Sequence, residues 1–369
     1  SRTINGPAIM LYCFLLATAE KQGVPFDRVR GTIQNDILKE YQAQHAWIYP
    51  PEPALKIIGD IFEWSAEHAP RFNTISISGY HIREAGSTAG QELAYTLKNG
   101  FTYVEQGIER GLDVDEFAPR LSFFWDVHND FFEEIAKFRA GRRIWARHMR
   151  EVYGAKQPES WRLRTHAQTA GVTLTAQQPY NNVARVAYQG LAAVLGGTQS
   201  LHTNALDETL ALPTEHAVRI ALRTQQILAY ETGVANTIDP LAGSYFIESL
   251  TDELEEEAER IFAEIDELGG VVAGIETGYF QGRIANSAHR FQAELEARNR
   301  LIVGVNAFEE ADEDHGLEIL RIDESAGQTQ RRRLEQLRRK RDTDRVRETL
   351  AALTAAAKRD ENLLPPMLD

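Results

Sequence analysis

The sequence predicts an α/β fold built on a parallel β-sheet, because short apolar segments alternate along the chain with longer helical ones. Five segments read as buried strands, at about 29–34, 73–79, 116–124, 162–168 and 197–203. Most of them end in His, Gln, Asn or Thr, and chemical groups of a (β/α)8 barrel collect at the strand ends. We therefore predict a TIM-type barrel.

Helical segments follow the predicted strands in order. They lie at 8–22, 54–68, 89–110, 130–153, 181–195 and 214–232. Five strand–helix units and a strand end at Thr3 and Ile4 fall short of the eight units that a closed barrel needs. We expect the barrel to lack its first strands, with about two or three units lying before Ser1.

The texture of the chain changes near residue 250. An acidic helix at 250–268 is followed by a polar stretch and by a basic run at 330–347. We predict a partial barrel over 1–249, holding strands about 3 or 4 to 8, and a mainly helical extension and linker over 250–369. The basic run is interleaved with Glu and Asp, which is typical of a solvated helix face. The apolar ending at 362–369 is expected to be an arm or the beginning of a removed segment, because no residues follow it to pack against.

Composition excludes several classes of protein. The 369 residues are 43% hydrophobic and 25% charged, as in ordinary globular chains. The net charge of −14 argues against nonspecific nucleic-acid binding. The single cysteine, Cys13, excludes an internal disulfide and suits the cytoplasm. No apolar run approaches the ~18 residues of a membrane-spanning helix, so we expect a cytoplasmic protein with neither a nucleic-acid nor a membrane partner.

Polar strand ends are the candidate site. One such residue is more often a satisfied core group, but four segments carry them, at 31–36, 75–81, 163–168 and 195–204. An unpaired buried polar group costs roughly 1–3 kcal/mol, so several together predict a polar ligand. The sequence has no HExxH pattern, no Gly-x-Ser-x-Gly elbow and no Gly-rich phosphate loop. No metal ligands are predicted, and the reactive species is expected to come from a cofactor.

Seven motifs carry a resemblance that covers nearly the whole chain. They are TIQNDILKE at 32–40, IYPPEP at 48–53, SISGYH at 76–81, FAPRLSFF at 117–124, RAGRR at 139–143, GGTQSLHTN at 196–204 and DPLAGSY at 239–245. In these motifs the chain resembles the large subunit of the methylmalonyl-CoA mutase family. The resemblance implies radical rearrangement of acyl-CoA carbon skeletons with adenosylcobalamin as cofactor.

The resemblance also assigns residues. Acyl-CoA contacts fall on Thr32, Gln34, Arg71, His81, Arg120 and Ser122, and Gln168 is assigned to the substrate as well. Tyr80 and His81 would flank the reacting acyl group as the catalytic pair, with His81 donating to the thioester carbonyl. Cofactor contacts fall on His166, Asn204 and Glu208, of which Asn204 and Glu208 match residues that hold the deoxyadenosyl ribose.

One departure from the family concerns the substrate. Methylmalonyl-type members carry an Arg ten residues after the Gln of TIQ, where this chain has Gln44. An uncharged amide does not offset the desolvation of a carboxylate, so methylmalonyl-CoA should bind poorly. The same Gln marks isobutyryl-CoA mutase and 2-hydroxyisobutyryl-CoA mutase, so the resemblance implies isobutyryl-CoA and butyryl-CoA as the substrate pair. The alternatives are 2-hydroxyisobutyryl-CoA, and methylmalonyl-CoA with a displaced compensating cation.

A second departure concerns cobalamin. The family binds the lower face of the cofactor through Asp-x-His-x-x-Gly, and the pair Asp126 and His128 is followed by Phe131 in place of that Gly. We therefore expect the cobalamin-binding domain to be absent from this chain and a small cobalamin-binding subunit to supply the ligand in a hetero-oligomer. The alternative is that the domain follows Asp369 and has been removed. A noncatalytic acyl-CoA-binding or subunit-interaction module is the alternative class, and the chain alone is expected to be inactive.

Overall fold

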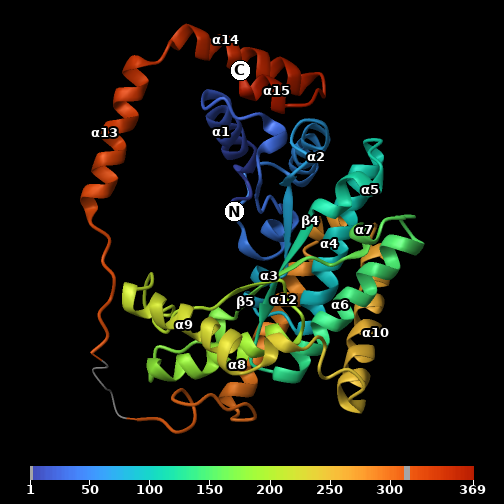
Figure 1. Ribbon diagram of the computed structural model, residues 1–369, viewed down its shortest axis with the longest axis vertical. Coiled ribbons are helices and arrows are strands. Elements are labelled where there is room, and N and C mark those ends of the chain that lie inside the picture. The colour runs from blue at the N-terminus through green and yellow to red at the C-terminus, as the bar shows by residue number, and fades with distance from the viewer. Residues whose placement is uncertain (1–2, 311–315) are drawn as a thin grey trace.

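The computed structural model describes residues 3–310 and 316–369 and confirms the predicted α/β fold (Figure 1). Its strands are β1 (Gly31–Thr32), β2 (Phe72–Asn73), β3 (Ile75–Ser78), β4 (Leu121–Val127), β5 (Thr165–Thr169) and β6 (Ser200–His202). β1 pairs with β2, β3 to β6 pair in sequence order, and every pair is parallel.

A backbone hydrogen bond joins the two sheets into one open arc: Ser76 N of β3 donates to Gln34 O, just after β1, at 2.8 Å. Ile33 N donates to Asn73 O at 3.2 Å and extends the β1–β2 pairing. Asn35 N donates to Ile4 O at 2.9 Å, which places the predicted strand end beside β1. The arc is the part of a TIM-type barrel that the sequence predicted.

The strand predicted at 116–124 is wrong in its first half. Residues 114–120 form the short helix α5 (Val114–Phe117) and a 3-10 turn (Ala118–Arg120), and β4 begins only at Leu121. Asp113 caps α5 by accepting from Asp115 N at 2.9 Å, and Pro119 fixes a helical φ in the turn. The other strands are shorter than the predicted segments and extend at most one residue beyond them, and the segment predicted at 73–79 divides into β2 and β3.

The helices agree closely with the prediction, and some add to it. They are α1 (Ala8–Lys21), α2 (Pro51–His68), α3 (Tyr80–Glu84), α4 (Ala89–Glu109), α6 (Phe131–Glu151), α7 (Pro158–Trp161), α8 (Asn182–Leu195), α9 (Glu215–Glu231), α10 (Tyr245–Glu267), α11 (Val271–Glu276), α12 (Tyr279–Glu296), α13 (Glu324–Lys340), α14 (Thr343–Lys358) and α15 (Leu364–Leu368). α10 spans the predicted domain boundary at 249/250 and packs against α4 and α6.

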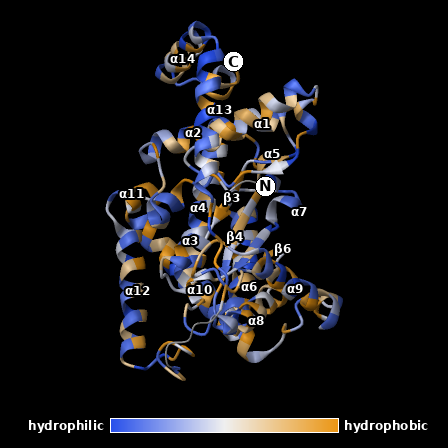
Figure 2. Ribbon diagram, turned by 90° about the vertical axis from the view of Figure 1, so that its left-hand side faces the viewer, coloured by the Kyte–Doolittle hydropathy of each residue, from blue (hydrophilic) through white to orange (hydrophobic). Residues whose placement is uncertain are grey.

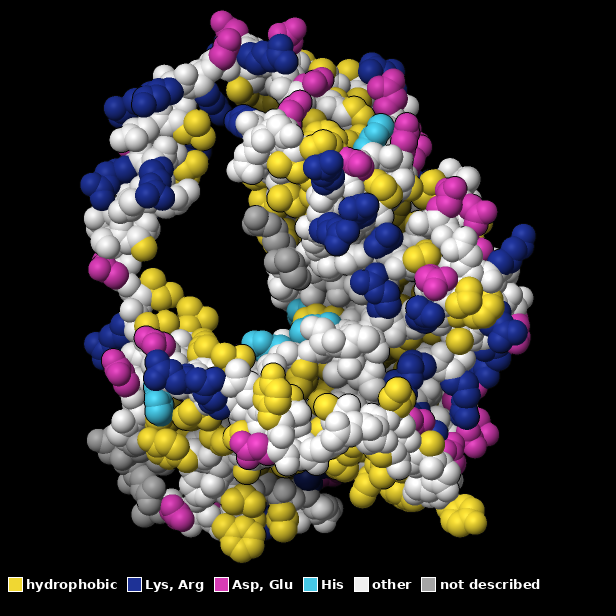
Figure 3. All heavy atoms as spheres, viewed as in Figure 1, with side chains coloured by type: hydrophobic (Ala, Val, Ile, Leu, Met, Phe, Trp, Pro, Cys, Tyr) yellow, Lys and Arg dark blue, Asp and Glu magenta, His cyan; other side chains and the backbone are white. Residues whose placement is uncertain are grey.

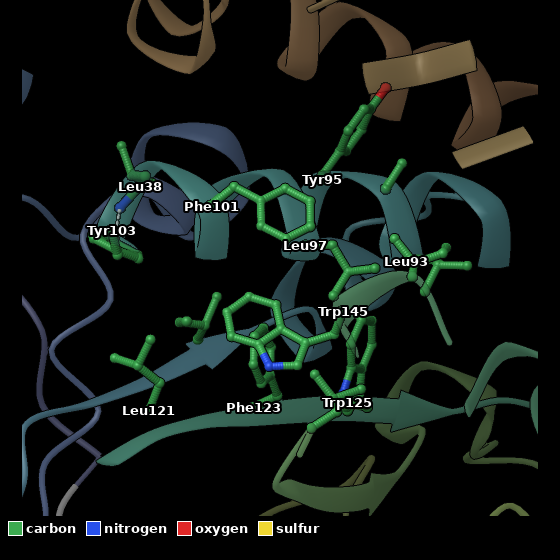
Figure 4. Packing of buried hydrophobic residues seen from close by; sticks show 14 of the residues in the cluster. Leu38, Leu93, Tyr95, Leu97, Phe101, Tyr103, Leu121, Phe123, Trp125 and Trp145 are labelled. Atoms are coloured by element: carbon green, nitrogen blue, oxygen red, sulfur yellow. Dashed lines mark hydrogen bonds between the residues drawn. The ribbon is translucent and has the colours of Figure 1, made fainter. Parts of the chain in front are cut away.

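The main core lies between the sheet and these helices. Phe101 of α4 stacks on Trp145 of α6 at 5.5 Å between ring centroids, above Phe123 and Trp125 of β4 (Figure 4). Outer helices such as α12 carry both hydrophilic and hydrophobic residues, as expected of helices with one buried face (Figure 2). The core uses one face of the strands, and the side chains that alternate with it lie on the opposite face, which is the candidate location of a site.

A buried ion cluster links α4 to α6. Lys137 Nζ donates to Glu92 Oε2 at 2.6 Å and to Glu134 Oε2 at 2.5 Å, and these side chains are at most 1% exposed. Lys137 also donates to Asp126 O at 2.8 Å, so the cluster extends to the end of β4.

The C-terminal segment packs instead of forming an arm, so that expectation is wrong. Leu364 is buried in a cluster with residues of α1 and α2, and Asn362 Nδ2 donates to Asp60 O at 3.0 Å. Leu363 N donates to Asp60 Oδ2 at 3.1 Å. Its apolar partners lie more than 290 residues earlier in the chain, which is why local sequence did not indicate them.

α13 forms an arch that stands away from the body, with an opening beneath it (Figure 3). It has no buried residue. Before it, Arg185 Nη2 donates to Val303 O at 2.8 Å, and after it α15 packs on α1. Within residues 3–310 and 316–369, no helix is long and apolar enough to cross a membrane.

Candidate functional site

Register places polar side chains on the face of the strands opposite the core, which we call the lumen. Residues paired across parallel strands share a face, and alternate residues of one strand share it as well. Two levels follow, with Ser78, Phe124, His166 and Ser200 in one and Asp126, Gln168 and His202 in the next. Histidine side chains border the opening in Figure 3. The polar lumen expected from the strand ends is present.

Tyr80, Gln168 and Asn204 meet at the carboxyl ends of the strands. Gln168 Nε2 donates to Tyr80 OH at 2.9 Å and to Asn204 Oδ1 at 2.8 Å. Asn204 Nδ2 donates to Thr169 O at 2.8 Å, which fixes the orientation of its amide. The ring of Tyr80 stacks on Phe124 at 4.9 Å. Three of the predicted site residues therefore form one hydrogen-bonded group.

His81 belongs to the same group. Its ring meets Tyr80 and Phe124 edge-on, with centroids 5.5 and 5.8 Å away. Burial, and then the ammonium of Lys39, lower the pKa of His81 to about 3. Its Nδ1 is buried and has no hydrogen-bond partner among the described residues. A neutral imidazole carries one donor and one acceptor, so His81 can hydrogen-bond a ligand in the lumen.

Gln34 lies beside the strand end that holds Asn5. Asn5 Nδ2 donates to Gln34 Oε1 at 2.8 Å, and Asn5 Oδ1 accepts from Asp36 N at 3.1 Å. Asn5 therefore sets which end of the Gln34 amide remains free. The sequence analysis missed Asn5, because only the fold brings it next to a residue 29 positions away.

The amino ends of the strands carry the remaining substrate candidates. Asn73 Nδ2 donates to Thr32 Oγ1 at 2.9 Å, and Arg164 Nη1 donates to Asn73 Oδ1 at 3.3 Å. Arg120 ends the turn before β4. The pKa of Arg164 is lowered mainly by burial and also by the nearby charge of Arg120. Asn73 and Arg164 were also missed.

Other predicted residues lie apart from the Tyr80 group. Arg71 is exposed just before β2, and Ser122 Oγ donates to Ile75 O at 2.9 Å. His166 Nδ1 lies 2.8 Å from Ser200 Oγ, one level nearer the amino ends than Gln168. Glu208 follows Asp207 and is exposed to solvent. Partial desolvation of its carboxyl group and, second, the charge of Asp207 raise the pKa of Glu208.

Gln44 is exposed at the end of a π-helical turn, Glu40–Gln44. Its side-chain oxygen accepts from the buried ammonium of Lys39. The turn packs against α3, which carries Tyr80 and His81. The structure thus brings Gln44 near the acyl-binding candidates through Lys39, a residue the sequence analysis did not single out.

The backbone at Gly171 lies close to groups that could bind a cofactor. A Cβ at this position would lie 3.0 Å from Glu84 Oε2 and 3.3 Å from both Asn204 Nδ2 and Tyr80 OH. A side chain here would crowd these carboxylate, amide and phenol groups, whose hydrogen-bond donors and acceptors suit the hydroxyl groups of a sugar. No group of three or more potential metal ligands occurs among the residues that the structure describes.

An open parallel barrel with polar groups at its strand ends is an architecture of barrel enzymes. Comparison with known proteins gives the family: residues 1–369 match the family described as methylmalonyl-CoA mutase. The chain belongs to the methylmalonyl-CoA mutase family.

Relatives support this assignment over the whole chain. The methylmalonyl-CoA mutase of Cereibacter sphaeroides is 50% identical over 370 residues, covering 100% of this chain and 52% of the relative. The methylmalonyl-CoA mutase large subunit of Porphyromonas gingivalis is 48% identical over 366 residues, covering 99% of this chain and 51% of the relative. The mitochondrial enzyme of Homo sapiens is 47% identical over 371 residues, covering 100% of this chain and 49% of the relative. The chain thus spans about half the length of these relatives.

Proposed function

We propose that this chain is the substrate-binding barrel, or large-subunit part, of an adenosylcobalamin-dependent acyl-CoA mutase. The observation that carries the proposal is the lumen group in which Tyr80, Gln168 and Asn204 are hydrogen-bonded beside a neutral His81. When bound, adenosylcobalamin supplies a carbon radical. The residues of the chain bind, orient and shield the acyl group.

The thioester would lie against His81, whose buried Nδ1 has no partner among the described residues. The Tyr80 ring, held flat by Phe124 and hydrogen-bonded to Gln168, would form a wall of the acyl pocket. Thr32, Gln34 and Ser122 would follow the coenzyme toward the amino ends of the strands. There the guanidinium groups of Arg71 and Arg120 suit phosphate oxygens.

The cofactor sugar would lie beside Gly171, against Asn204 and Glu208, with His166 deeper in the lumen. The Asn204 amide is held by Gln168 and Thr169, so it would meet a hydroxyl in a fixed orientation. The ligand for the lower face of cobalamin would come from a separate domain or a small subunit in a hetero-oligomer. The Porphyromonas gingivalis relative, named a large subunit, supports this arrangement.

Two substrates are candidates. The names of the relatives support methylmalonyl-CoA. One observation favours an uncharged acyl group such as isobutyryl: position 44 holds a neutral amide, and the nearby Lys39 ammonium is already paired with Glu40 at 2.5 Å. A carboxylate needs an unneutralised cation or several donors to offset its desolvation. The proposal includes a cytoplasmic location, because a chain with a single cysteine forms no internal disulfide and suits a reducing compartment.

The test is turnover by the complete enzyme with adenosylcobalamin and its cobalamin-binding partner. We expect isomerisation of a branched short acyl-CoA, and we expect His81→Ala to lower kcat by about 100-fold or more, the usual size of a lost positioned donor. Isobutyryl-CoA, 2-hydroxyisobutyryl-CoA and methylmalonyl-CoA are compared by kcat/KM. An enzyme that binds these esters without converting any of them would support the noncatalytic module instead.

A further inference from the structure

The π-helical turn after β1 brings together the side chains of Lys39 and Gln44, which are five residues apart. In an α-helix, residues five apart are about 1.4 turns apart and point to different sides. Here His45 N donates to Glu40 O at 2.6 Å, the i to i+5 closure of a π-turn, and His45 ends the turn with φ at 62°. This winding places Gln44 over Lys39.

Lys39 has a fully buried side chain with two partners. Its Nζ donates to Glu40 Oε1 at 2.5 Å and to Gln44 Oε1, and Glu40 Oε2 accepts from Ala46 N at 3.0 Å. An ammonium group only donates hydrogen bonds, so it selects the oxygen of the Gln44 amide. The Gln44 NH2 group is therefore directed away from Lys39.

Lys39 also acts on the site. Its charge is one of the causes that keep His81 neutral, and α3, which begins at Tyr80, packs against the π-turn. Lys39 thus lies close to both the predicted specificity residue Gln44 and the predicted catalytic residue His81.

We propose that Lys39 is a positioning residue that fixes the Gln44 amide with its NH2 group as the donor offered to the acyl branch. This inference rests on the proposed function, since it assumes that an acyl-CoA lies beside His81. A freely rotating glutamine would offer oxygen or nitrogen equally. A glutamine held by Lys39 offers nitrogen only.

The test is a mutant cycle in the complete enzyme with adenosylcobalamin and its cobalamin-binding partner. K39M/E40Q removes the ion pair as a unit, and the buried Asp36, which Lys39 also stabilises, keeps its hydrogen bonds from Tyr103 OH and Ser78 N. Gln44→Met removes both ends of the amide. We expect K39M/E40Q to raise the KM for the preferred acyl-CoA about three- to tenfold, as for one lost oriented hydrogen bond, with a smaller effect on kcat. In the Gln44→Met background the same change should have no further effect.

A purely structural role for Lys39 would give the same loss in both backgrounds, and that result would overturn the proposal. Lys39→Arg, with Glu40 retained, is the conservative variant: a guanidinium also only donates hydrogen bonds, so the Gln44 oxygen should stay fixed and the KM should stay near that of the parent. If K39M/E40Q does not fold, Gln44→Glu is decisive: it keeps an oxygen for Lys39 and replaces the outward NH2 with oxygen. An unchanged KM in Gln44→Glu would refute the proposal.

Binding separates this inference from the proposed function. Calorimetric titration with isobutyryl-CoA should show the same coupling between Lys39 and Gln44 in its Kd, whether or not turnover occurs. Coupled binding without turnover would support the role of Lys39 and reject mutase activity. Turnover with additive effects would support the mutase and reject the role of Lys39, and absence of acyl-CoA binding would reject both.

Discussion

Asn5 shows how one amide can set the orientation of another at the scale of a residue. Its Nδ2 holds the Gln34 oxygen at 2.8 Å, so the Gln34 nitrogen is left for the lumen. Asn5→Asp removes that donor and should reverse the Gln34 amide. We expect kcat/KM for acyl-CoA to fall about tenfold, measured in the complete enzyme.

Asn306→Asp is a control for this change. Asn306 Nδ2 donates to Leu295 O at 3.0 Å and to Arg300 O at 2.8 Å, in a segment outside the proposed site. The substitution should cost stability and leave kcat/KM unchanged. Equal kinetic losses in the two variants would show that the Asn5 effect is a general consequence of disturbing an amide.

The titration of His81 should affect stability at acid pH. Its pKa is about 3 in the folded protein, where burial favours the neutral ring, and near 6.5 when unfolded. Between these values the unfolded chain binds the extra proton, so the free energy of unfolding should fall as pH drops from about 6.5 toward 3, by at most about 1.4 kcal/mol per pH unit. Chemical denaturation at several pH values should show a shallower decline for His81→Gln.

The exposed His289 provides the control, since His289→Gln should retain the slope of the parent protein. Identical slopes in the parent and in His81→Gln would contradict the burial of a neutral ring.

The residues that sequence reasoning found and those it missed differ in a physical way. Tyr80, Gln168 and Asn204 were found because each follows a short apolar strand, and the carboxyl ends of parallel strands meet at one edge. Asn5, Lys39 and Asn73 act through partners that only the tertiary fold or an irregular π-turn brings near, and neither leaves a periodic signal in the sequence.

The buried ion cluster between α4 and α6, at the scale of elements, is centred on Lys137. Lys137→Met would remove the ammonium shared by Glu92 and Glu134 and leave Arg83, 3.8 Å from Glu134 Oε1, as the remaining cation. We expect a loss of about 3–5 kcal/mol in the free energy of unfolding, measured by denaturant titration. Arg219→Met removes an exposed ion pair with Glu215 on α9 and should change stability by no more than about 0.5 kcal/mol. A loss of similar size in both variants would rule out the special role of burial.

The prediction of elements succeeded where periodicity extended over many residues. Helices such as α4, which starts at a capping box of Thr88 and Gln91, were located within a residue or two. The segment 116–124 failed because the apolar residues Phe117 and Ala118 are buried from a helical turn, which gives the same composition as a strand. Composition alone does not separate the two when a segment is this short.

At the scale of the whole molecule, the C-terminal helix α15 packs against the N-terminal helices α1 and α2. Leu364 of α15 is buried against α1 and α2. Leu364→Ala should weaken this contact by about 2–5 kcal/mol. Hydrogen exchange should therefore become faster in α14, α15 and α1, with α4 and α6 unchanged. Leu337→Ala on the exposed helix α13 should alter none of these rates. Uniformly faster exchange across the molecule in Leu364→Ala would contradict a contact that stabilises only α1, α14 and α15.

α13 lies between two anchored segments of the chain: Arg185 Nη2 donates to Val303 O before it, and Leu364 of α15 packs on α1 and α2 after it. The apolar partners of Leu364 lie more than 290 residues earlier in the chain. A contact between residues so far apart requires the entropy of closing a long loop before any burial is gained. We therefore expect seating of α15 to be the final event of assembly, and pulse-labelling during refolding should show protection appearing there last.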